Sequence, residues 1–213
     1  SGAESVVVNI TRETESFVFT DVPNSPVPSI LRGFSAPVKL EYPYSRDELM
    51  FLMSHDSDGF NRWEAGQRLA IDVIQEMIAG IHKNATEQAG ASAEIMVDQR
   101  LITACSSVLE QAIAAGKDPR FDRAMIAAML ILPSESYLAE LQDVVDVDAI
   151  HEARERVRRE IAIRLRPQLM AIYELCEGGQ TYEATGSEIG RRDLRNVALA
   201  YLMQAGDEES LAL

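Results

Sequence analysis

The hydrophobic period of this chain changes between residues 41 and 45, and this change constrains the fold more than any other feature. Before it, apolar residues form short β-branched and aromatic runs, which are typical of strands. After it, they recur at i, i+3, i+4 and i+7, the spacing of amphipathic helices. The sequence therefore predicts a mainly α fold preceded by a short β remnant.

The segment before the change contains four candidate strands. They are residues 6–10, 17–19, 27–31 and 38–42. Pro23, Pro26, Pro28 and Pro37 lie among them, and proline disfavours helix. We therefore expect extended structure in this part of the chain.

The helical part begins with a capping box formed by Ser45 and Glu48. Further helices are expected over 60–82, 93–115, 119–132, 134–143, 147–165, 167–176 and 187–204. The short loops between them favour antiparallel helix pairs, stacked as a bundle or an α-solenoid. No repeat of fixed period is visible, so the pattern supports no named repeat family.

The charge balance restricts the possible partners. The chain has 34 acidic and 20 basic side chains and a formal net charge of −14. Nucleic acids and anionic membranes are disfavoured, because binding phosphate requires a basic face. The two cysteines, Cys105 and Cys176, exclude a secreted disulfide scaffold. With no signal peptide and no apolar run of about 20 residues, the sequence predicts a cytoplasmic protein.

One segment is similar to half of a zinc-peptidase helix. That motif needs two histidines four residues apart, but the chain has His151, Glu152 and, in the second position, Glu155. Both glutamates have an arginine four residues later, Arg156 and Arg159. We interpret the segment as a solvated face of ion pairs and not as a metal site.

A second acidic segment, Asp56-Ser57-Asp58-Gly59, is similar to the start of a calcium loop. The twelfth position, which needs a bidentate glutamate, is Gln67. A turn between two helices, capped by the acidic and serine side chains, is the better interpretation.

The remaining reactive residue types form no complete catalytic constellation. The two cysteines have no neighbouring histidine, so each is interpreted as a small core residue. His55 and His82 are expected at helix ends, where an imidazole favours the helix dipole. Arg191, Arg192 and Arg195 are interpreted as an ion-pair surface or an interdomain contact. The glycines at 178, 179, 186 and 190 match no phosphate-binding pattern.

Several segments resemble bacterial aminopeptidase N, in the order in which that family has them. The most specific is residues 26–42, with the sequence Pro-Val-Pro-Ser-Ile-Leu-Arg-Gly-Phe-Ser-Ala-Pro-Val-Lys-Leu-Glu-Tyr. The others are residues 60–67, 132–134, 148–155, 169–173 and 191–196. The resemblance covers essentially the whole chain.

This resemblance implies a domain plan and a parent activity. The family consists of large zinc-dependent exopeptidases that remove N-terminal amino acids from peptides. Residues 1–41 would be the terminal strands of an Ig-like β-sandwich, and residues 42–213 the first part of the helical C-terminal domain. The family's zinc ligands and catalytic residues lie upstream of this segment. The resemblance therefore assigns no catalytic, cofactor-binding or metal residue here and places zinc only in the longer parent.

The expected function is that of a non-catalytic fragment that walls off the active-site cavity and gates access of substrates. Its partners would be the upstream catalytic domain and, in the parent, peptide substrates, with self-association through the cut surfaces. Two alternatives remain open: a free-standing helical module that binds peptides or proteins, and an enzyme that uses Cys105 or Cys176.

Overall fold

The helices begin at the predicted capping box. The Ser45 hydroxyl accepts a hydrogen bond from the Glu48 amide, and the Glu48 carboxylate accepts one from the Ser45 amide at 2.7 Å. Two amides that have no partner within the helix are thus satisfied at the start of α1 (Arg46–His55).

In the computed structural model the chain is described over residues 5–86, 96–178 and 183–206. Within these ranges it forms eight α-helices and one short 3₁₀ turn, η1 (Arg32–Phe34). After α1 follow α2 (Gly59–Thr86), α3 (Gln99–Ala115), α4 (Arg123–Leu130), α5 (Glu135–Glu140), α6 (Val147–Arg164), α7 (Arg166–Leu175) and α8 (Gly186–Ala205). The predicted mainly α class is confirmed.

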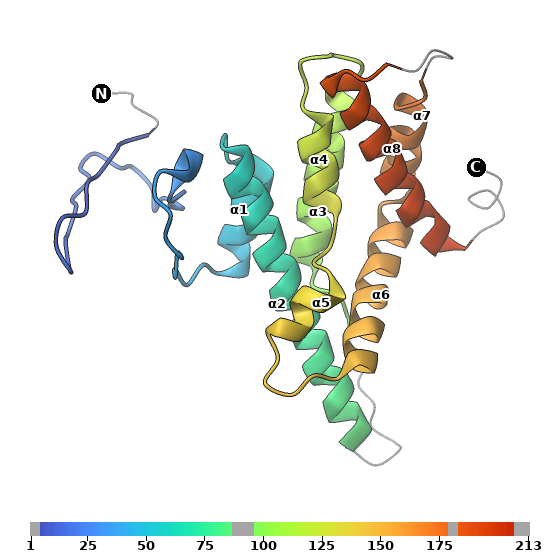
Figure 1. The fold of residues 1–213 in the computed structure, drawn as a ribbon, viewed down its shortest axis with the longest axis horizontal. Coiled ribbons are helices and arrows are strands. Elements are labelled where there is room, and N and C mark those ends of the chain that lie inside the picture. The colour runs from blue at the N-terminus through green and yellow to red at the C-terminus, as the bar shows by residue number, and fades with distance from the viewer. Residues whose placement is uncertain (1–4, 87–95, 179–182, 207–213) are drawn as a thin grey trace.

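The helices pack in layers around one apolar core. The N-terminal segment lies beside α1 and α2, α3 and α4 form the middle, and α7 and α8 lie on the opposite side (Figure 1). The long α2 contacts α1, α4 and α6, while α8 contacts α4, α6 and α7. The largest fully buried side chains include Leu69, Ile74, Leu109, Leu138 and Ile161.

Two helices start later than predicted, each at an aspartate cap. Asp98 accepts a hydrogen bond from the Arg100 amide, so α3 begins at Gln99 and not at 93; residues 93–95 lie outside the described part of the chain. Asp122 accepts from the Met125 amide, which starts α4 three residues after the turn that contains Pro119. Both helices therefore begin where a side chain can accept from the free backbone amides, and not where the apolar spacing begins.

The other predicted boundaries agree with the structure within a few residues. Ser134 caps α5 by accepting from the Tyr137 amide. Pro167 stands in the first turn of α7, directly after α6, where its missing N–H is tolerated. Gly206 ends α8 in the left-handed conformation.

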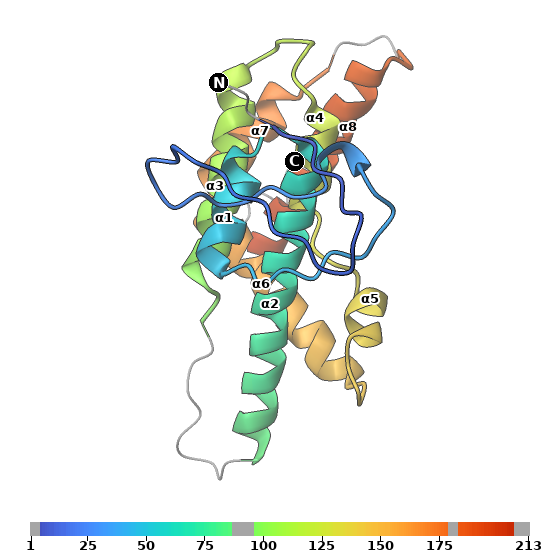
Figure 2. The ribbon, with the colours of Figure 1, turned by 90° about the vertical axis from the view of Figure 1, so that its left-hand side faces the viewer.

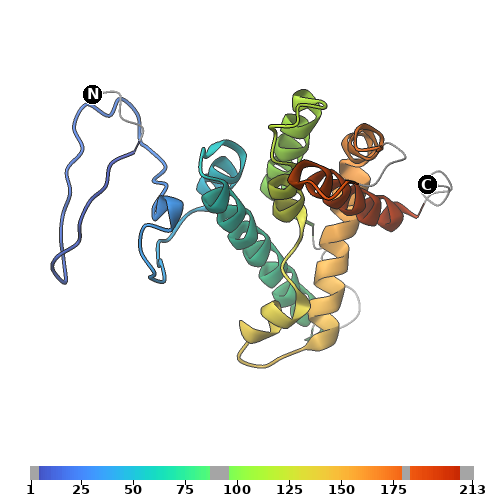
Figure 3. The same ribbon diagram turned by 45° about the horizontal axis from the view of Figure 1, so that its top comes forward.

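No strand forms among the described residues, so the four predicted strands were wrong for this structure. A strand needs a neighbouring backbone for its hydrogen bonds, and the described residues of these segments pair with none. The early part instead makes an open loop away from the helices (Figure 3). Its apolar side chains are exposed, among them Val7 and Val18. Self-association through this segment stays a prediction.

The contact between α4 and α8 depends on a glycine. A Cβ built on Gly190 would lie 2.8 Å from the backbone nitrogen of Ala124. Real Cβ atoms essentially never approach another atom this closely. The absence of a side chain therefore sets how near the two helices approach.

We predict that Gly190→Ala destabilises the fold by about 1–3 kcal/mol, because the added methyl forces α4 and α8 apart. The matched control is Gly186→Ala on the same helix, where a Cβ would meet no atom within 4 Å. Chemical unfolding of the three proteins measures the difference. Equal stabilities of the two variants would contradict the packing argument.

Candidate functional site: the junction on the first helices

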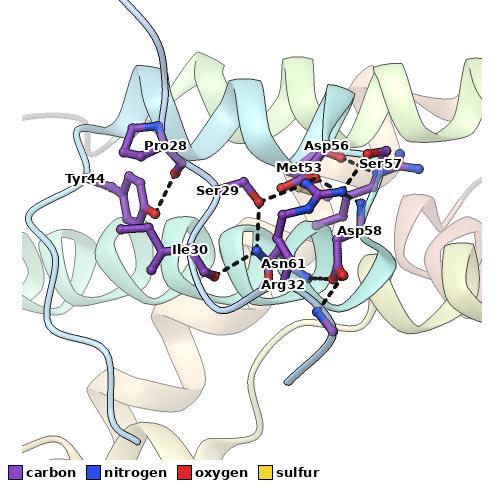
Figure 4. Close-up of polar contacts among 12 residues, drawn as sticks. Pro28, Ser29, Ile30, Arg32, Tyr44, Met53, Asp56, Ser57, Asp58 and Asn61 are labelled. Atoms are coloured by element: carbon purple, nitrogen blue, oxygen red, sulfur yellow. Dashed lines mark hydrogen bonds and ion pairs between the residues drawn. The ribbon is translucent and has the colours of Figure 1, made fainter. Parts of the chain in front are cut away.

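Residues 28–33 are fastened to the turn between α1 and α2 by polar contacts (Figure 4). The Arg32 guanidinium forms an ion pair with the Asp56 carboxylate. It also donates to the hydroxyl oxygens of Ser57 at 2.6 Å and Ser29 at 3.1 Å. One side chain thus joins the incoming segment to two successive residues of the turn.

Asp58 adds a second connection across the junction. Its carboxylate accepts from the Gly33 amide at 2.9 Å and from the Asn61 amide at 3.0 Å. Burial tends to raise the pKa of Asp58, but these two N–H donors and the charge of Arg32 outweigh it, so the pKa is below its ordinary value. The carboxylate therefore stays ionised and caps the start of α2 while it holds Gly33.

Neutral side chains complete the attachment. The Asn61 amide group donates to the Ser29 hydroxyl at 2.8 Å and to the Ile30 carbonyl at 3.0 Å. The Tyr44 hydroxyl donates to the Pro28 carbonyl at 2.7 Å. Burial raises the pKa of Tyr44, so the phenol keeps the proton that this bond needs.

On its buried side, the α1–α2 turn is connected to α3 by hydrogen bonds. The Asp56 side chain is only 1% exposed, and its second oxygen has no hydrogen bond to any described residue. Arg62 donates to the Met53 carbonyl at 2.9 Å and to the Gln111 side chain at 2.8 Å. Burial lowers the pKa of Arg62, although the charge of Asp56 opposes the effect. The contacts therefore run from the N-terminal segment through the turn to the third helix.

A groove of 770 Å³ lies between residues 30–43 and α2, with Tyr137 of α5 also in its wall. Its apolar wall includes Phe34 and Phe60, whose ring centres are 4.0 Å apart. Glu64 also lines it, and Arg68 donates to the Tyr42 carbonyl at 2.7 Å. The groove offers contact surface and hydrogen bonds, but its lining contains no paired nucleophile and base.

The structure places His151 on α6 with its Nδ1 2.9 Å from the Glu135 carboxylate of α5. The hydrogen bond to Glu135 and its charge raise the pKa of His151. Glu152 pairs with Arg156 as predicted. Glu155 pairs with Arg158 at 3.0 Å, in place of the predicted Arg159.

The acidic segment at 56–59 serves as a turn between helices. The Asp56 carboxylate accepts a hydrogen bond from the Asp58 amide at 2.9 Å, and Asp58 caps α2. Gln67, which occupies the twelfth position of the compared calcium loop, donates to the Ile131 carbonyl at 2.8 Å. The interpretation as a capped turn agrees with these contacts, but the attachment to Arg32 was not foreseen.

Both cysteines are buried. Burial raises the pKa of the Cys105 thiol to about 12. Burial also raises the pKa of Cys176, against the opposing charges of Arg123, Arg191 and Arg195. Neither thiol is therefore ionised at neutral pH.

The histidines and the arginine cluster are used in local contacts. His55 is the last residue of α1 and lies against Phe51. His82 bonds to Asp146, the residue that caps α6, at 2.9 Å. Arg191 pairs with Glu188 at 2.8 Å, and the guanidinium of Arg195 lies over the Tyr173 ring at 4.3 Å. Arg192 donates to the Glu183 carbonyl at 3.1 Å.

The described residues contain no group of three histidine, cysteine or acidic side chains close enough to hold a metal ion. They therefore offer no ligand set for the zinc ion that the family resemblance implies for the longer parent. Of the helices that the structure describes, none combines the length and apolar character needed to cross a bilayer.

Two family models match the chain, one on each side of the junction. Residues 46–213 match a domain of unknown function, DUF3458_C, described as ARM repeats. The chain belongs to this family. Residues 1–43 match a second domain of unknown function, DUF3458, described as an Ig-like fold. The stacked helix pairs that the sequence predicts after residue 45 therefore correspond to ARM repeats in this family.

The relatives of this DUF3458_C protein include several aminopeptidases. It is 37% identical to Aminopeptidase N of Escherichia coli over 196 residues, which is 92% of the chain and 21% of that protein. It is 34% identical to Aminopeptidase N of Caulobacter vibrioides, covering 90% of the chain and 20% of that protein. The chain thus spans about a fifth of these relatives and is homologous to that part of aminopeptidase N.

A solved structure supports the same relationship. The crystal structure of Legionella pneumophila aminopeptidase A in complex with aspartic acid matches with a TM-score of 0.66 and 26% identity. The match covers 90% of this chain and 21% of the other.

Acid should loosen the junction. Because the pKa of Asp58 is lowered in the fold, its contribution to stability is full above the unfolded value of about 3.9 and is lost as the pH falls through the folded value. Trp63, the one tryptophan of the chain, lies 5.6 Å from the Phe60 ring, which touches Phe34. We predict a change in tryptophan fluorescence below about pH 4, ahead of global unfolding.

Asp58→Asn should show the loosened fluorescence already at neutral pH, because an amide cannot accept with both of its heavy atoms. Asp143→Asn, at an exposed position between α5 and α6, is the control and should behave as the unchanged protein. The same acid transition in all three proteins would refute the role of Asp58.

The buried thiols should be inert in the native fold. We predict that a maleimide reagent labels neither cysteine within minutes at pH 7, whereas both react in denaturant, because the native thiols are protonated and inaccessible. Mass spectrometry counts the labels. Rapid labelling of one native thiol would revive the hypothesis of a cysteine-dependent enzyme.

Proposed function

We propose that this chain is a non-catalytic part of a zinc metallo-aminopeptidase that removes N-terminal amino acids from peptides. The single observation that carries the proposal is 37% identity to Aminopeptidase N over 92% of the chain. In the longer protein, residues 42–213 would wall off the active-site cavity and restrict access to it. Residues 1–41 would end the preceding β-sandwich.

The attachment of residues 28–33 to the α1–α2 turn supports this role. A helical domain that walls off a cavity must keep a fixed orientation relative to the domain that precedes it. Arg32 and Asp58 hold the incoming segment at points on both sides of the α1–α2 turn. Contacts made from several directions restrict rotation more than a flexible linker does. Loosening them would thus change the shape of the cavity without touching the chemistry.

The partners follow from the same proposal. The catalytic domain of the same protein would supply zinc and its chemistry, which is to polarise the scissile carbonyl and activate water. The net charge of −14 would attract basic N-termini of peptides and repel nucleic acids and anionic membranes. We also propose a cytoplasmic location, which two buried, unpaired cysteines favour.

The chain alone, loaded with zinc, should release no detectable product from an aminoacyl anilide. The product of the whole reading frame that contains it should hydrolyse the same substrate, because the reacting groups would lie upstream. A colorimetric anilide assay compares them. Turnover by the isolated chain, or a reading frame without any hydrolase segment, would overturn the proposal.

Within that longer protein, Arg32→Met should raise the hydrolysis of long peptides relative to a dipeptide anilide by about threefold or more, since a loosened wall admits larger substrates. Arg120→Met is the control, because this exposed arginine pairs only with Asp118 in its own turn. The readout is the ratio of kcat/KM values. An unchanged ratio beside a normal dipeptide rate would contradict the gating role but leave the aminopeptidase assignment standing.

A further inference from the structure

The end of α5 and its connection to α6 carry apolar side chains on the outside of the molecule. In the stretch 137–147 only Leu138 is buried. The exposed large apolar residues are Tyr137, Leu141, Val144, Val145 and Val147. Val144 is 83% exposed. In Figure 2, α5 and its connection to α6 lie at the right-hand edge of the molecule, below α4. Apolar side chains gathered in this way are typical of interaction surfaces.

The same stretch carries negative charge without any positive charge. From residue 131 to 148 the sequence has five acidic side chains and no lysine, arginine or histidine. Two of the five, Glu135 and Asp146, bond to His151 and His82. The carboxylates of the other three, Glu140, Asp143 and Asp148, are exposed and receive no hydrogen bond or ion pair from the described residues. These three are free to pair with basic groups of a partner.

The surface is held in place before anything binds to it. The bonds of His151 to Glu135 and of His82 to Asp146 are each 2.9 Å long. Arg154 donates to the Pro133 carbonyl, also at 2.9 Å, just before α5. Together with the buried Leu138, these contacts fix the stretch at both of its ends. A surface that is already ordered loses less conformational entropy on binding.

We propose that residues 137–148 are a docking surface for a basic, amphipathic segment of a separate polypeptide. Its apolar side chains would cover the exposed valines, and its lysines or arginines would pair with Glu140, Asp143 and Asp148. A second copy of this chain fits poorly. In a twofold contact through this surface, the same carboxylates of both copies would face one another. The inference does not rest on the proposed aminopeptidase role.

The test uses a fluorescently labelled amphipathic helical peptide made of leucine and lysine, with a leucine–glutamate peptide of the same pattern as its counterpart. Fluorescence anisotropy should show that this chain binds the lysine peptide and not the glutamate peptide. Added salt should weaken the binding, because exposed charges are screened.

Matched variants locate the site. Val144→Ser should weaken binding about fivefold, whereas Val7→Ser, at a valine that is 86% exposed in the N-terminal segment, should not change it. Asp143→Asn should likewise weaken binding, whereas Asp193→Asn on α8 should not. All four side chains are exposed, so circular dichroism and thermal unfolding should show unchanged folds.

Three results would overturn the proposal. The first is equal weakening by the site variants and their controls, which would mean attraction to the acidic protein as a whole. The second is a concentration-dependent dimer that Val144→Ser abolishes, which would mean that a second copy occupies the surface. The third is strong hydrogen-exchange protection of residues 137–148 in the longer protein alone, which would mean that the surface is already covered.

Discussion

The ion pair between Arg32 and Asp56 is the interaction on which the placement of the N-terminal segment depends. The Asp56 side chain is almost completely buried, and an unpaired charge in such a place costs about 3–5 kcal/mol. Loss of the guanidinium would therefore destabilise the α1–α2 turn, although the Asp58 amide also bonds to Asp56. Arg32 in turn is held by η1 and by Ser29, so the segment and the turn stabilise each other.

The polar contacts continue beyond the turn, because Arg62 and Gln111 bond to each other and to the end of α1. Gln111 of α3 accepts from Arg62 and donates to the Ser54 carbonyl at the end of α1. Three helices therefore meet at one polar centre beside the apolar core. Such a centre adds little net stability, since each of its bonds replaces a bond to water. Its effect is on orientation, because Arg62 of α2 and Gln111 of α3 both donate to carbonyls at the end of α1.

The sequence revealed the features whose partners lie close together in the chain. The capping box at Ser45, the cap at Ser134 and the pairing of Glu152 with Arg156 each involve residues three or four apart. The attachment of Arg32 to Asp56, 24 residues away, has no such local signal. The predicted strands do not form among the described residues for the related reason that a β-branched run indicates extended backbone but not the neighbour that pairs with it. Glu155 shows the limit even within one helix, since both an arginine three residues away and one four residues away were in reach.

The candidate junction and the acidic apolar surface are connected by α2. Near its start, Asp58 and Asn61 hold the N-terminal segment, and near its end, His82 holds the residue that caps α6. With 28 residues, this helix is about 42 Å long. Leu69, Val73, Ile74 and Met77 in its middle are buried in the core, so the helix cannot turn about its axis without disturbing that packing. A displacement at the junction would therefore reach the α5–α6 connection as a movement of a rigid rod.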